Sequence, residues 1–119
     1  VVTVEANIYS ALNALVSGRV FPDTAPLTTT RHYITYTQIG GEALTYFEAA
    51  VPSKQNGRFQ VNVWGDTRSQ CSALMLQIES ALVMATPMQA KPIGASSTSY
   101  DHDMLMYGSM QDFSIWSDR

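Results

Sequence analysis

The clearest pattern of apolar and polar positions in the chain runs from Arg58 to Ala85. Apolar residues alternate with others over positions 59–64 (Phe-Gln-Val-Asn-Val-Trp), a period of two that is typical of a strand with one face on a core. Gly65 and Asp66 break this alternation. Apolar residues then recur at three- and four-residue spacing, as on one face of a helix, at Cys71, Leu74, Met75, Ile78, Ala81, Leu82 and Ala85. The stretch predicts a strand, a tight turn and a helix that pack on each other.

Signals for the two ends of this helix support the prediction. Asp66 or Thr67 can cap its N-terminus, and Gln70 follows Thr67 by three residues, as in a capping box. Pro87 is expected to stop the helix soon after its last apolar position.

A first helix is expected near the start of the chain, capped by Thr3 and followed by Gly18 as its C′ residue. Its apolar stripe is formed by Val4, Ile8, Ala11, Leu12 and Leu15. A short extended piece is expected over 19–21, before Pro22 and Asp23. Residues 24–30, with Pro26 and a run of threonines, indicate a surface loop.

Further strands are predicted on both sides of the central unit. Residues 32–39 are rich in strand formers, and Gly40-Gly41 marks a turn or bulge. A second extended piece is expected over 43–47, and 48–57 is interpreted as a long connection. After the second helix, 89–93 is a candidate strand and 95–99 a turn or mobile loop.

The C-terminal part contains two apolar extended runs, which Gly108 and Ser109 are expected to separate. The predicted order is therefore helix, strand, strand, strand, helix, strand, strand. That order favours one α+β domain over 1–119, with two helices packed on a mostly antiparallel sheet.

Composition adds a question about the surface. At 119 residues the chain has the size of one domain, but only 14% of its residues are charged, against roughly 25% in typical soluble domains. Either the surface is rich in uncharged polar residues, or part of it is buried against other subunits. The net charge is −3 and the basic residues are scattered, which argues against sequence-specific binding of duplex DNA.

The single cysteine, Cys71, lies on the apolar face of the second helix, so we expect a buried thiol and no disulfide within the chain. No apolar run approaches the roughly 20 residues of a membrane span. The first residues lack the order of a signal peptide. These features predict a soluble protein made in a reducing compartment, with no membrane partner.

Candidate chemistry is sparse. Asp101, His102 and Asp103 invite a metal or acid–base interpretation, but neighbours in a strand point to opposite faces, so a polar turn or strand edge is favoured. His32 has no partner nearby in the sequence. No nucleophile elbow, phosphate loop or carboxylate pair is recognisable. We therefore predict no catalytic residue, no cofactor and no metal.

Three apolar residues of the second helix fall off its main stripe: Leu76, Val83 and Met84. They either lie under a wide, buried helical face or form a second apolar face that packs on a neighbouring subunit. The second interpretation is preferred, so these residues are candidates for an interface.

Several strings, taken in order, resemble a known family. Phe59 to Trp64 followed by Gly65-Asp66-Thr67 is the first, and Gly18 to Pro22 and Tyr33 to Tyr36 fit the same pattern. The close of the chain matches too, in Tyr100-Asp101-His102-Asp103, Leu105-Met106-Tyr107 and Asp112 to Trp116. Together they resemble the small tail-completion or tail-terminator proteins of long-tailed bacteriophages and prophages.

The resemblance implies a structural virion protein at the head-proximal end of the tail, made in the host cytoplasm. Such proteins form a ring, usually of six subunits, that caps the tail tube, ends its polymerisation and offers a surface to the head connector protein. DNA passes through the lumen without specific binding. The loop beginning at Glu48, with Lys54 and Arg58, is the candidate for contact with the tube or a neighbour. A head–tail connector or other minor tail component, and a small α+β ligand-binding module, remain the alternatives.

Overall fold

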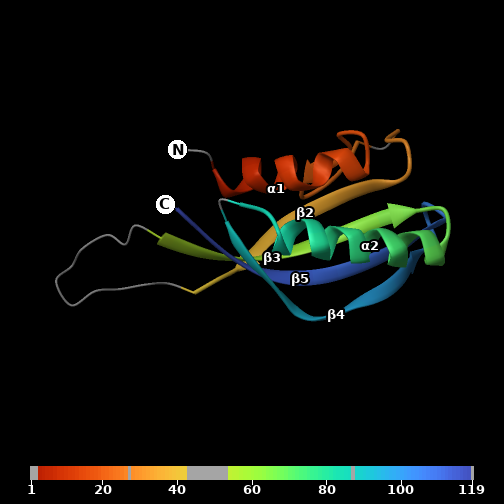
Figure 1. Ribbon diagram of the computed structural model, residues 1–119. Coiled ribbons are helices and arrows are strands. Elements are labelled where there is room, and N and C mark those ends of the chain that lie inside the picture. The colour runs from red at the N-terminus through yellow and green to blue at the C-terminus, as the bar shows by residue number, and fades with distance from the viewer. Residues whose placement is uncertain (1–2, 27, 43–53, 87, 119) are drawn as a thin grey trace.

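The computed structural model describes residues 3–26, 28–42, 54–86 and 88–118, and within them five strands form one sheet that carries both helices on the same face (Figure 1). The strand order is β1-β2-β3-β5-β4; β1 and β2 are parallel and the other neighbours are antiparallel. In chain order the elements are α1 (Val4–Leu12), the 3-10 helix η1 (Asn13–Leu15), β1 (Val20–Pro22), β2 (Tyr33–Gly40), β3 (Lys54–Gly65), α2 (Arg68–Val83), β4 (Gln89–Asp101) and β5 (Met106–Asp118). This is the predicted α+β fold, with the predicted order of elements.

The core lies between the helices and one face of the sheet, as the periodicities predict. In β3 the alternating residues Phe59, Val61 and Val63 are buried, and Phe59 stands opposite Phe113 of β5. The predicted face of α2 packs on them through Cys71, Met75, Ile78 and Leu82, and α1 contributes Ile8 and Leu12. Burial of these apolar side chains is the main stabilising contribution to the fold.

Both predicted helix caps are present. The Thr3 hydroxyl accepts a hydrogen bond from the Ala6 N–H, and the Thr67 hydroxyl accepts one from the Gln70 N–H, each at 3.2 Å. The Gln70 side chain does not complete the capping box. Its Oε1 instead forms a hydrogen bond with His32 Nε2 at 2.8 Å, which links α2 to the start of β2.

The prediction of a turn or mobile loop over 95–99 is wrong, because β4 continues through it to Asp101. Residues 97–101 pair with 110–106 of β5, so their backbone groups are paired whatever their small polar side chains prefer. The register shifts between Ile93 and Ser97, where Gly94 has a φ of +73°. The Gln111 amide donates to the Gly94 carbonyl at 3.0 Å, so the irregularity is held in place by a side chain.

Two other boundaries also differ from the predictions. Gly108 and Ser109 do not separate two runs, since β5 passes straight through them opposite Trp64 and Val63. The predicted long connection ends earlier than expected, because 54–57 already belong to β3 and pair with 115–118. The extended piece expected over 43–47, the rest of the connection and Pro87 lie outside the described residues.

Candidate interaction surfaces

The face of the sheet opposite the helices carries no helix and is mostly polar, and we call it the uncovered face. Only at β2 does the loop after β1 lie over it, where Tyr33 and Thr35 are buried. It is formed by the residues that alternate with the core positions, such as Thr37, Gln60 and Asn62, which stand beside one another on β2 and β3. Uncharged hydroxyl and amide groups can be hydrated on such a face, whereas the opposite face is closed by α1 and α2 (Figure 1). The sheet therefore has one structural face and one available for contact.

Two ion pairs cross from β3 to β5 on the uncovered face. The Arg58 guanidinium contacts Asp112 Oδ2 through Nη2 at 2.7 Å and Nε at 3.2 Å, and Lys54 pairs with Asp118. Lys54 and Arg58, predicted to lie in or beside a long loop, thus stand on a strand, and their charges are compensated by neighbouring carboxylates. No local pattern in the sequence indicates these partners, since Arg58 and Asp112 are 54 residues apart in the chain.

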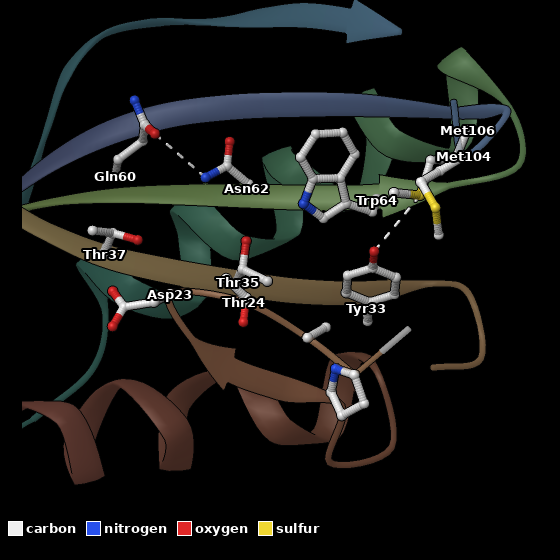
Figure 2. A pocket seen from close by; sticks show the side chains of 12 residues that line it. Asp23, Thr24, Tyr33, Thr35, Thr37, Gln60, Asn62, Trp64, Met104 and Met106 are labelled. Atoms are coloured by element: carbon white, nitrogen blue, oxygen red, sulfur yellow. Dashed lines mark hydrogen bonds between the residues drawn. The ribbon is translucent and has the colours of Figure 1, made fainter. Parts of the chain in front are cut away.

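A pocket of about 360 Å³ lies on the same face, beneath the loop that follows β1 (Figure 2). One end is apolar, where Tyr33 stands opposite Trp64 with Met104 and Met106 nearby; the other end is polar and reaches Asp23. Its volume falls at the low end of small-molecule sites, roughly 300–1,000 Å³. The pocket combines apolar and polar lining groups, the combination expected of a ligand-binding module.

The second surface is the outward side of α2. Leu76, Val83 and Met84 are 66%, 48% and 81% exposed, so the interpretation that they lie under a wide buried face is wrong for the isolated subunit. Leu76 and Val83 are seven residues apart and share one side of the helix, while Met84 is the C-cap residue. A neighbouring molecule would remove these apolar side chains from water.

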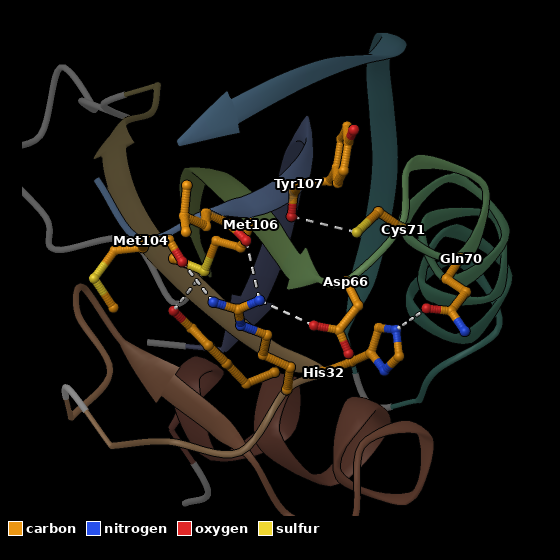
Figure 3. A network of polar contacts seen from close by, with 10 residues as sticks. His32, Asp66, Gln70, Cys71, Met104, Met106 and Tyr107 are labelled. Carbon is orange, nitrogen blue, oxygen red and sulfur yellow. Dashed lines mark hydrogen bonds and ion pairs between the residues drawn. The ribbon is translucent and has the colours of Figure 1, made fainter. Parts of the chain in front are cut away.

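A network around Arg31 fixes one end of the sheet (Figure 3). Its guanidinium contacts Asp66 Oδ1 at 2.9 Å and donates to the carbonyls of Met104 and Leu105. One side chain thereby joins the start of β2, the turn before α2 and the turn between β4 and β5. Each contact of the guanidinium is with a residue in a turn, so the role of Arg31 is to hold these two turns against the start of β2.

Asp101 is the last residue of β4, and His102 and Asp103 begin the β4–β5 turn. The Asp101 carboxylate accepts hydrogen bonds from the N–H groups of Asp103 and Met104, at 2.9 and 3.1 Å, which is ordinary turn chemistry. His102 stacks edge-on against Tyr100, with ring centroids 4.9 Å apart. Within the described part of the chain no group of three His, Cys, Asp or Glu side chains could hold a metal ion.

Cys71 is fully buried, and its Sγ donates to the Tyr107 carbonyl at 3.4 Å. Burial, and to a lesser degree the Asp66 carboxylate, raises the pKa of this thiol. The thiolate required for nucleophilic chemistry is therefore disfavoured.

The sequence-based interface candidates fall on two surfaces. Lys54 and Arg58 belong to the uncovered sheet face, and Leu76 and Val83 to the helical layer on the other side. Glu48 lies outside the described residues. Their roles in assembly remain predictions.

Comparison with known proteins then gives a family. Residues 9–118 match the family described as "Tail completion protein gp17". Among solved structures, a chain of the virion of a native gene transfer agent particle is similar to this one at 15% identity, with a TM-score of 0.64 and coverage of 98% of this chain and 95% of that chain. Another solved chain gives 12% identity, a TM-score of 0.52 and coverage of 99% and 97%. A search of curated proteins found no match.

A membrane-spanning helix is not found among the described residues, since neither helix there is sufficiently long and apolar.

Proposed function

This chain belongs to the tail completion protein gp17 family and is a structural protein of the phage-tail type, and we propose that it caps the tail tube as a closed ring. In this role it ends polymerisation of the tube protein and gives the head connector a surface to join. The ring is proposed to contain six subunits and to lie at the head-proximal end of the tail. The role is carried out by contact surfaces, without a chemical reaction.

The observation that carries the proposal beyond the family is the division of the subunit into two unlike faces. The helical layer exposes Leu76 and Val83, while the opposite sheet face is polar. A ring requires a head-to-tail contact between different patches, repeated until the rotation closes. The exposed apolar side of α2 supplies one patch for such a contact, and the polar sheet face is left free for another use.

We assign the uncovered sheet face to the lumen. Phosphate contacts dominate the affinity of proteins for DNA, so a passage for DNA should present few unpaired cations. On this face Lys54 and Arg58 are compensated by Asp118 and Asp112, while Lys91, which the register places on the same face opposite Ser114, forms no ion pair with another described residue. The surface presented to DNA is hydrated and carries little net charge where these pairs lie.

Binding to isolated tail tubes tests the role. Purified protein is mixed with tubes assembled from tube protein and imaged by electron microscopy, with growth of the tubes followed after fresh tube protein is added. We expect density at one end of each tube and no further growth from that end. Random labelling along the tube, or unchanged growth, would contradict the proposal.

A connector role is distinguished by position in the particle. Labelled subunits are located in the particle, and tube length is measured in particles made without this protein. A label between the tube and the head together with tubes of normal length would assign the chain to the connector instead. Tubes of uncontrolled length would support the terminator role.

A further inference from the structure

The two edges of the sheet are built differently. At one edge β4 runs for 13 residues, and among the described strands it pairs only with β5. Between Lys91 and Asp101 it carries no charged residue. At the other edge β1 has three residues and ends in Pro22, which blocks further pairing. The long β4 edge lacks the charges that usually prevent pairing with another chain.

One side of α2 stands above the β4 edge. Its stripe is Ser72, Leu76, Glu79 and Val83, at four- and three-residue spacing. Ala73, Leu74 and Gln77, on a different side, line a pocket with Leu15 and Arg19, next to α1. Ser72 shares a pocket with Tyr107 of β5. The stripe therefore points away from α1, over β5 and β4, both of which α2 contacts.

The opposite side of the subunit is formed by α1 and the edge strand β1. There Tyr9 is 41% exposed, close to Gly18, which its hydroxyl group approaches. Glu5 and Asp23 are both exposed. Glu5 precedes Tyr9 by four residues on the same side of α1, and Asp23 directly follows β1 and lines the pocket on the uncovered sheet face. This side is apolar at Tyr9 and acidic beside it.

We propose that the α2–β4 side of one copy packs against the α1–β1 side of the next, with Leu76 and Val83 against Tyr9 in the helical layer and Lys91 facing Asp23 on the side of the uncovered sheet face. Lys91 is exposed, lies on that face opposite Ser114 and forms no ion pair with another described residue, so it is available to Asp23, which lines the pocket on the same face. Because the two sides differ, the contact is head-to-tail. Each of two joined copies keeps its other side free for a further copy, and this repeats until the ring closes. This inference rests on the proposed ring and identifies the surfaces that close it.

Disulfide trapping tests the contact with the protein alone. In a Cys71→Ala background, Leu76→Cys and Tyr9→Cys are combined in one chain and oxidised. A bond forms only where the two Cα atoms come within roughly 4.4–6.8 Å. We expect a ladder of covalent oligomers that stops at the ring, seen on non-reducing gels and removed by reductant.

Single variants and a misplaced pair serve as controls. Leu76→Cys alone and Tyr9→Cys alone should give only a low yield of dimers, and Leu76→Cys with Thr37→Cys, on the uncovered sheet face, should give no ladder. A ladder of equal yield from that misplaced pair, or none from the intended pair, would overturn the proposal. So would efficient dimers from Leu76→Cys alone, because they would show that α2 pairs with itself.

A charge exchange gives a second measurement that does not depend on cysteine geometry. Lys91→Glu in the trapped chain should weaken the ladder, and addition of Asp23→Lys should restore it. Circular dichroism and thermal unfolding check that each variant folds. If the cysteine pair gives no ladder and the charge exchange has no effect, the contact is refuted. If the ladder forms but the protein does not bind tube ends, only the proposed function is refuted.

Discussion

At the scale of single residues, Gly108 shows how packing rather than a turn can require glycine. It is the third residue of β5, opposite Trp64, and a Cβ built there would lie 2.8 Å from the Trp64 ring and 2.8 Å from Ser99 Oγ. We expect Gly108→Ala to lower the free energy of unfolding by about 1–3 kcal/mol, because the ring must shift. Urea unfolding measures the cost. In a double-mutant cycle with Trp64→Leu the cost should fall, and an unchanged cost would contradict the explanation.

The Thr67 hydroxyl closes the N-terminus of α2, the helix that covers most of the sheet. Thr67→Ala removes the acceptor of the Gln70 N–H and should cost about 1 kcal/mol of unfolding free energy. Thr67→Ser keeps the acceptor and serves as the matched control in the same urea titration. Equal losses in the two variants would show that the cap is not the cause.

Alkaline pH should destabilise the protein through three buried groups. Burial raises the pKa values of Cys71, Tyr33 and Tyr36, so the folded state holds these protons more tightly than the unfolded state does. Their contribution is complete below the ordinary thiol pKa of about 8.5 and is lost as the pH rises through the raised values. Urea midpoints at neutral and alkaline pH measure the fall. Cys71→Ala should reduce it, and an unchanged fall in that variant would assign it to the tyrosines.

At the scale of elements, the β3–β5 ladder sets the charge of the uncovered face. Arg58 and Asp112 meet on this ladder because Arg58 pairs with Ser114 and Gln60 with Asp112, one diagonal step away. The pair adds little to stability, as is usual for exposed ion pairs. Its proposed value is that it keeps a cation from binding DNA.

Removing the carboxylate should therefore increase binding to DNA. Asp112→Asn leaves the Arg58 charge uncompensated, so we expect tighter binding to a labelled DNA duplex. The slope of the logarithm of the binding constant against the logarithm of the salt concentration should become steeper by up to about one. Fluorescence anisotropy at several salt concentrations measures both. Asp103→Asn is the matched control, since it makes the same change in net charge in the β4–β5 turn. Equal effects of the two substitutions would assign the change to net charge alone.

At the scale of the whole molecule, the low charge content is explained only partly by polar side chains. Serine, threonine and amide groups cover the sheet face, but Leu76 and Val83 remain exposed on α2. A protein that functions as a monomer gains nothing from apolar side chains that are exposed to solvent. Their exposure is consistent with a protein whose working form has neighbours.

Substitution of these two residues should separate folding from assembly. Leu76→Gln with Val83→Gln changes only exposed positions, so the free energy of unfolding should stay within about 0.5 kcal/mol of the wild type. Binding to tube ends should be lost or strongly reduced. Ala73→Gln with Ser80→Gln, exposed positions elsewhere on the same helix, provides the control. Normal tube binding by the Leu76 and Val83 variant would exclude the α2 side from assembly.

The sequence by itself determined the elements and the faces they bury. The alternation through Phe59, Val61 and Val63 and the helical spacing from Cys71 to Leu82 are local properties of the chain, as are the caps at Thr3 and Thr67. Periodicity and capping act within a few residues, so they can be recognised without knowledge of the fold.

Only the tertiary structure decided how distant segments meet. The strand at 97–101 exists because β5 offers backbone partners, and the charge of Arg58 is compensated because the register brings Asp112 beside it. The role of Gly108 likewise depends on Trp64 across the ladder. These features come from strand pairing between residues far apart in the chain, and strand pairing leaves no local signature in either partner.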